Sequence, residues 1–152
     1  EATLQASRDA SRRRSNRNLH PTLDDPIQRM FNVFQPDSYV RVHAHPPDRW
    51  EVFVRLSGSA AVLVFDDAGA VADTAVLAGH RDVAVEIPGG RWHTVFALEP
   101  DTVLFEVKPG PYRPLAESEF AQWAPREGTE ESAASLAAWR RLAGPLLDGG
   151  RS

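Results

Sequence analysis

Three histidines and one glutamate stand at spacings that could support chemistry. His43 and His45 are separated by one residue, Glu51 follows His45 after five intervening residues, and His93 comes shortly after a Pro88-Gly89-Gly90 turn. Imidazole and carboxylate groups are suitable ligands for divalent transition metals. Four protein ligands leave two positions of a six-coordinate ion for water, substrate or dioxygen. The sequence therefore predicts one divalent transition-metal ion, either Fe, Zn, Ni or Mn, held by these four residues.

The elements that would position these residues are short β-strands. Strand-like segments recur at residues 27–34, 39–45, 51–56, 60–65, 70–77, 83–87, 93–98 and 102–108, and Pro, Gly and Asp separate them. About eight short strands at this spacing are typical of a β-sandwich or barrel. Residues i and i+2 of a strand point to the same side. His43 and His45 would therefore project together, and Glu51 would face them from the next strand.

The chain reads as one domain with two flanks. Residues 1–20 are rich in arginine and predict an N-terminal arm, residues 21–128 the barrel, and residues 129–152 a C-terminal helical tail. We expect the tail helix over residues 130–143, because Leu136 and Trp139 share a face and Gly144-Pro145 would end it. A hydrophobic content of 42% with 25% charged residues is an ordinary globular balance.

Two residues beside the histidines are candidates for contact with a substrate. Tyr39 and Arg41 would share the inward face of His43 and His45 if the strand is regular. An arginine aimed into the cavity would bind an anion, whereas an arginine at the rim would pair with an acid. The predicted catalytic residues are Glu51, Arg41 and Tyr39, with Arg41 or Tyr39 orienting the substrate and Glu51 available as a base.

Four further polar residues extend the predicted substrate site. Asn18 and His20 lie where the N-terminal arm could fold over the mouth of the barrel, although an exposed turn before Pro21 fits them as well. Gln28 and Asn32 share one face of a predicted strand, so they line either a wet cavity or an exposed surface.

Composition excludes several classes of function. The sequence has no cysteine, so disulfides, thiolate catalysis and iron–sulfur clusters are excluded. A net charge of −4 argues against a nucleic-acid or anionic-membrane partner. The longest apolar runs are too short to span a bilayer, and no segment resembles a signal peptide, so we expect a cytoplasmic protein. Exposed sheet edges favour a homodimer, and the expected partner is a small-molecule ligand or substrate.

The histidine and glutamate spacings resemble the two motifs of the cupin superfamily. His43-Ala44-His45, Glu51 and Gly58 match the first motif, and Pro88-Gly89-Gly90 with His93 matches the second. Asp37, Asp82 and Ala97 stand where the motifs have Gly, Gly and Asn, and the gap between His45 and Glu51 is longer. The resemblance implies an all-β fold, a double-stranded β-helix (cupin jelly roll), with the short N-terminal arm and the C-terminal helix added to it.

A more specific resemblance covers about residues 18–125. The strings Trp92-His93-Thr94, Glu106-Val107-Lys108-Pro109-Gly110-Pro111-Tyr112 and Trp123-Ala124-Pro125 look like the WbuC family, which comprises small single-domain cupin metalloproteins. That family is often associated with bacterial surface-polysaccharide gene clusters. The resemblance implies the same four metal ligands, His43, His45, Glu51 and His93.

Three classes of function remain open from the sequence. The first is a metal-dependent enzyme, of oxygenase, isomerase or lyase type, that acts on a small polar or anionic molecule. Its substrate would be sugar-like or carboxylate-like, in polysaccharide or small-molecule biosynthesis, and its metal would be a Lewis acid or a dioxygen-binding centre. The second is a non-catalytic, metal-dependent module that binds a small ligand. The third is a jelly roll in which the metal only stabilises the fold.

Overall fold

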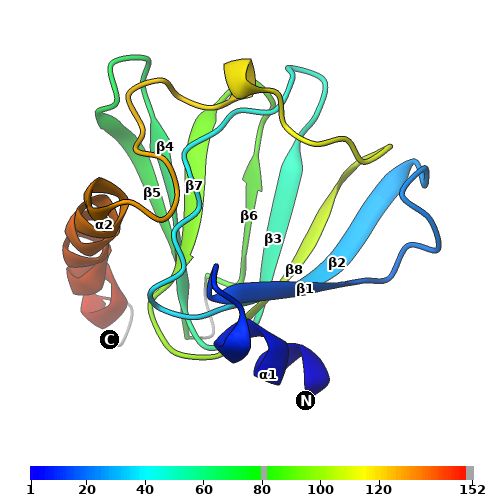
Figure 1. Cartoon of the computed structure of the whole chain (residues 1–152). Helices are drawn as coiled ribbons and strands as arrows, with labels where there is room; N and C mark the ends of the chain where they lie inside the picture. The colour runs from blue at the N-terminus through cyan, green and yellow to red at the C-terminus, as the bar shows by residue number, and fades with distance from the viewer. Residues whose placement is uncertain (80–81, 150–152) are drawn as a thin grey trace.

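The computed structural model describes residues 1–79 and 82–149, and its central feature is a pair of antiparallel sheets (Figure 1). One sheet has the strand order β1-β2-β8-β3-β6, and the other has the order β5-β4-β7. The strands are β1 (Arg14–Asn18), β2 (Ile27–Phe34), β3 (Glu51–Ser57), β4 (Ala60–Phe65), β5 (Val71–Leu77), β6 (Ala84–Ile87), β7 (Trp92–Ala97) and β8 (Thr102–Pro109). The helices are α1 (Ala2–Asp9), the 3-10 turn η1 (Glu117–Glu119) and α2 (Glu130–Gly149).

The space between the sheets is filled by alternate side chains of facing strands. Strand β4 is apolar along its whole length, which is typical of a strand that is buried on both faces. Its residues Ala60 and Val62 belong to one core with Phe53 of β3 and Leu104 of β8. Phe53 and Val95 of this core also line a cavity that holds polar side chains.

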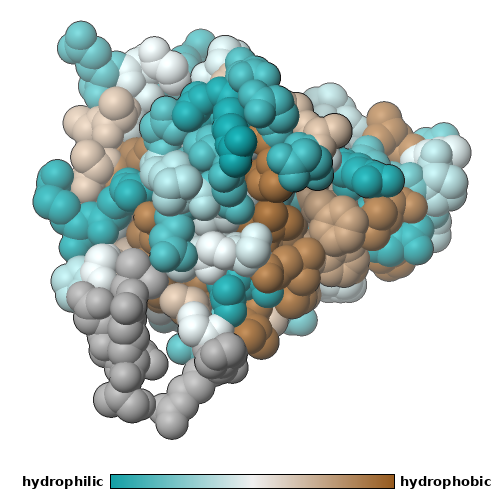
Figure 2. All heavy atoms as spheres, turned by 90° about the horizontal axis from the view of Figure 1, so that it is seen from below, coloured by the Kyte–Doolittle hydropathy of each residue, from teal (hydrophilic) through white to brown (hydrophobic). Residues whose placement is uncertain are grey.

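A second core lies on the outer face of the small sheet. Figure 1 shows α2 running along this side, at the left of the view. Leu63 and Phe96 pack there with Leu136 of α2, and Trp139 stacks on Tyr39 with ring centroids 5.5 Å apart. The large sheet is contacted by the short helix α1, which lies beside β1 and β2 (Figure 1). Seen from below, hydrophobic side chains gather on the right, where the large sheet lies in Figure 1, between hydrophilic regions (Figure 2).

The strand expected at residues 39–45 is wrong, and β1 of the N-terminal arm completes the set of strands instead. The segment is extended, but it divides its backbone bonds between two neighbours. His43 pairs with His93 of β7, whereas Val42 accepts a bond from Ala121 and Ala44 donates one to Glu119. No ladder of consecutive pairs forms, because each neighbour is within reach over only one or two residues.

The end expected for the C-terminal helix is also wrong. Helix α2 continues through Gly144-Pro145 to Gly149. A proline inside a helix costs one backbone hydrogen bond, but packing can outweigh that loss. Leu136 and Ala143 are buried against the small sheet, and the guanidinium of Arg140 donates to the carbonyls of Pro36 and Ala97. Among the described residues, none of the helices is both long and apolar enough to cross a bilayer.

Candidate metal centre

The structure brings together the four predicted metal ligands. One donor atom from each of His43, His45, Glu51 and His93 lies within 4.8 Å of all the others. The Nε2 atom of His93 is 3.1 Å from Oε2 of Glu51, and Nε2 of His45 is 3.5 Å from Oε1. Glu51 opens β3, His93 is the second residue of β7, and the other two come from the extended segment before β3. Three separate stretches of chain thus meet at one end of the sandwich.

Backbone contacts between the two motif segments explain why the donors converge. The N–H of His43 donates to the carbonyl of His93 over 3.1 Å, and the reverse bond is 2.9 Å. The N–H of Gly90 donates to the carbonyl of His45 over 2.8 Å. Gly89 allows this approach, because a Cβ atom there would lie 2.3 Å from the carbonyl oxygen of Pro46. The Pro-Gly-Gly turn therefore sets the position of His45 as well as that of His93.

We predict that Gly89→Ala weakens metal binding about tenfold, because the added methyl group must push the His45 segment away from His93. Competition with a chromophoric chelator would measure the dissociation constant. Gly144→Ala is the matched control, since a Cβ there meets no atom within 4 Å. Equal metal affinity in both variants would contradict this account of the turn.

The state of the imidazoles fits a bound metal. Nδ1 of His43 lies 2.9 Å from the carbonyl oxygen of Arg41, and Nδ1 of His93 lies 2.8 Å from that of Arg91. A carbonyl oxygen only accepts, so each Nδ1 can keep a proton, and each Nε2 would then be free to offer a lone pair to a bound ion. Nε2 of His45 is buried and has no hydrogen-bond partner among the described residues. Burial and the nearby His93 lower the pKa of His43 to about 3, so this ring is neutral and able to act as a ligand.

Two charged residues of β8 complete the surroundings of Glu51, and the sequence reasoning missed both as site residues. Nζ of Lys108 donates to Oε1 of Glu51 over 3.1 Å and forms an ion pair with Oε1 of Glu106 at 2.5 Å. Burial raises the pKa of a carboxyl group, but Lys108 and the neighbouring histidines hold the pKa of Glu51 well below its usual range. Burial and the negative charge of Glu51 raise the pKa of Glu106 to about 8. The sequence did offer a signal for them, because Glu106 and Lys108 stand at positions i and i+2 of a mostly apolar strand and therefore share one of its faces.

A cavity of about 250 Å³ lies beside this cluster. Its lining includes ligands (His43 and Glu51), apolar side chains (Phe34, Val40, Phe53 and Val95) and polar ones (Arg12, Arg14, Ser15, Asn16, Asn32, Glu106 and Lys108). Of the two polar residues of β2 that were predicted to line the site, Asn32 lines this cavity and Gln28 does not. The amide of Asn32 donates to Glu106. Gln28 is 1% exposed and donates to the carbonyl oxygens of Leu23 and Asp25.

Tyr39 and Arg41 are not among the residues that line this cavity. The hydroxyl of Tyr39 donates to the carbonyl oxygen of Pro125 over 2.9 Å. The guanidinium of Arg41 pairs with Glu117 at 2.9 Å, and its central carbon lies 4.9 Å from the ring centroid of Phe120. The expected alternation failed here because the segment forms no regular strand. Of the two readings of Arg41, the structure shows pairing with an acid, and the catalytic roles of both residues stay predictions.

The two arm residues are also separate from the ligands. His20 is 6% exposed, and its Nδ1 accepts a bond from the backbone N–H of Arg29 over 3.0 Å. Asn18 is exposed and accepts a bond from the side chain of Asn16. Neither residue lines the cavity beside the metal ligands, so their roles in substrate binding stay predictions.

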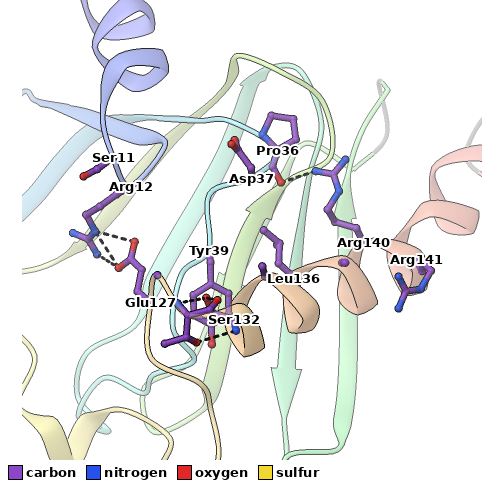
Figure 3. Close-up of a pocket in the computed structure, with 14 residues that line it drawn as sticks. Ser11, Arg12, Pro36, Asp37, Tyr39, Glu127, Ser132, Leu136, Arg140 and Arg141 are labelled. Atoms are coloured by element: carbon purple, nitrogen blue, oxygen red, sulfur yellow. Dashed lines mark hydrogen bonds and ion pairs between the residues drawn. The ribbon is translucent and has the colours of Figure 1, made fainter.

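A groove elsewhere on the molecule is a different feature. A groove of about 1000 Å³ runs between α2 and the N-terminal arm, with Tyr39, Leu136 and Arg140 in its lining (Figure 3). The guanidinium of Arg12 and the carboxylate of Glu127 form an ion pair at 2.7 Å on its opposite side. None of the four candidate metal ligands lines this groove.

Comparison with known proteins agrees with this description. Residues 1–77 match the family described as "Domain of unknown function (DUF6016)". The chain belongs to the DUF6016 family. The matched part of this DUF6016 protein holds His43, His45 and Glu51, and His93 lies beyond it. A search of proteins with curated descriptions finds no match.

Solved structures show that the DUF6016 chain has the cupin fold. KdgF from Halomonas sp. is 18% identical, with a TM-score of 0.51, over 66% of this chain and 82% of its own. A cupin superfamily protein from Desulfitobacterium hafniense is 12% identical, with a TM-score of 0.50, over 63% and 76%. A mutant of the oxalate decarboxylase OxdC from Bacillus subtilis is 20% identical, with a TM-score of 0.51, over 64% of this chain and 26% of its own. The predicted all-β cupin fold with a short N-terminal arm and a C-terminal helix is therefore confirmed, and the arm contains the short helix α1.

Proposed function

We propose that the protein is a metal-dependent cupin enzyme that acts on a small anionic molecule, sugar-like or carboxylate-like. The observation that carries this proposal is the convergence of three imidazoles and Glu51 beside a cavity that also holds Lys108. When bound, a divalent ion would supply a Lewis acid or a centre for binding dioxygen. A volume of about 250 Å³ is suited to a molecule with few heavy atoms.

The protein residues have separate tasks in this proposal. His43, His45, Glu51 and His93 hold the ion, and the backbone carbonyls at Nδ1 fix the orientation of two of the rings. Phe53 and Val95 form an apolar wall of the cavity that limits access of water. Glu51 stays our predicted proton acceptor, because it is the buried carboxylate nearest to the imidazoles.

A turnover screen tests the proposal. The metal-free protein would be loaded in turn with Fe(II), Mn(II), Ni(II) and Zn(II), and supplied with oxalate, small sugar acids and sugar phosphates. We expect at least one metal to support turnover that a chelator abolishes. Stabilisation by a compound without any turnover would instead indicate a non-catalytic binding module. Failure to bind any of these metals would contradict both functions.

The expected biosynthetic role, homodimer, cellular location and domain boundaries stay predictions. The WbuC-like strings are the support for a role in polysaccharide or small-molecule biosynthesis. Strands β1 and β6 end the large sheet, and such edges support a homodimer formed through sheet edges. The cytoplasmic location and the boundaries of the arm, barrel and tail are untested in the same way.

A further inference from the structure

Lys108 is the only lysine in the 152-residue sequence, which otherwise uses arginine at all its basic positions. It lies near the end of β8, in register with Gln28 of β2, and only 24% of its side chain is exposed. A lysine ammonium is a compact charge on a flexible stem, and its N–H groups can turn toward different acceptors. The single lysine thus lines the cavity beside the candidate metal ligands.

The surroundings of Lys108 hold the ammonium without using all of its donors. Oxygens of Glu51 and Glu106 are the two described partners of Nζ, at 3.1 Å and 2.5 Å. The amide of Asn32 donates to the other oxygen of Glu106, so this carboxylate is fixed in turn. An ammonium has three N–H donors. Within residues 1–79 and 82–149, the third donor has no described partner, so it is available to a ligand in the cavity that Lys108 lines.

The charges of the cavity favour an anion once a metal is bound. Even with both Glu51 and Glu106 counted as ionised, these two carboxylates, the ammonium of Lys108 and a divalent cation together leave one positive charge. Two further cations line the cavity, but Arg12 and Arg14 both pair with Glu127 at 2.7 Å. Of these three cations, Lys108 is the one with a described hydrogen bond to a candidate metal ligand, Glu51.

Lys108 also lines a second hollow of about 340 Å³, together with Arg49, Tyr112 and Phe120. The ring of Phe120 in its lining lies 6.3 Å from that of His43. Lys108 is therefore shared by this hollow and by the cavity beside the candidate ligands.

We propose that Lys108 is a substrate-binding residue that takes the anionic group of the substrate, a carboxylate or a phosphate, next to the metal. This inference rests on the proposed function, because it needs a metal in the cluster. It adds a specific contact that fixes the substrate class as an oxyanion. Glu106 and Asn32 are then positioning residues, since they hold the ammonium in place.

The single lysine allows a direct test on the full chain. Protein labelled with 15N only at lysine Nζ gives one side-chain resonance, and Lys108→Arg removes it and so confirms its assignment. We expect the resonance to shift when Zn²⁺ binds, because Glu51 is shared. A second, saturable shift should follow with oxalate or with inorganic phosphate, and the two titrations distinguish carboxylate from phosphate recognition.

Variants provide the second measurement. Lys108→Gln is expected to bind Zn²⁺ but to lose about tenfold or more in affinity for the preferred anion, because a charged hydrogen bond is removed. Arg141→Gln, at an exposed position of α2, is the control and should keep the wild-type affinity. If Lys108→Gln does not fold, the wild-type resonance alone decides.

The outcomes separate the two proposals. Binding of Zn²⁺ without any response of the Nζ resonance to either anion overturns the role of Lys108 and leaves the metal site intact. Unchanged anion affinity in Lys108→Gln does the same. Absence of Zn²⁺ binding in the wild-type chain overturns the proposed function and, with it, this inference.

Discussion

Replacing His45 with alanine is expected to weaken metal binding about 100-fold or more, because a directly coordinating ligand matters at least as much as its supporting partners. Nε2 of His45 is buried and has no hydrogen-bond partner in the described part of the chain, so its lone pair has no other use. His45 lies outside both apolar cores, so its removal should leave their packing intact. Elemental analysis after dialysis would measure the bound metal.

His20→Ala is the matched control for this experiment. His20 is also buried, but its ring bonds to the backbone of Arg29 and lies outside the cluster. We expect this variant to keep one metal ion per chain. Equal metal content in His45→Ala and the wild type would show that the four side chains do not form the site described above.

Adding a divalent metal to the metal-free protein is expected to raise its melting temperature by about 5–10 °C when the free metal is at 100 times its dissociation constant. The reason is that the four donors converge only in the folded chain, so the ion binds the folded state in preference to the unfolded state. They come from three stretches of sequence between residues 43 and 93. Calorimetry with Zn²⁺, Mn²⁺ and Ni²⁺ would measure the shift.

A chelator should reverse this stabilisation, and His45→Ala should show little of it. Comparing the metals also ranks their affinities, because the size of the shift depends on the dissociation constant of each. A melting temperature that no metal changes would mean that the donors do not bind an ion in the folded protein.

The sequence alone determined the type of fold and the identity of the four donors. Turn residues at regular intervals mark strand ends, and β4 was predicted at its observed bounds because its apolar run has clear breaks on both sides. The spacing of His43, His45 and Glu51 and the Pro-Gly-Gly turn before His93 are local features. They depend on backbone geometry over a few residues, so they can be read without the fold.

The tertiary structure alone decided which residues surround those donors. Lys108 and Glu106 reach Glu51 because β8 pairs with β3, and Asn32 reaches Glu106 because β2 pairs with β8 on the other side. Tyr39 turned toward α2, where Trp139 offers a stacking partner. Sequence periodicity gives the two faces of one strand, but it does not say which strands become neighbours. That choice depends on the packing of the two sheets and of α2, which joins residues far apart in the chain.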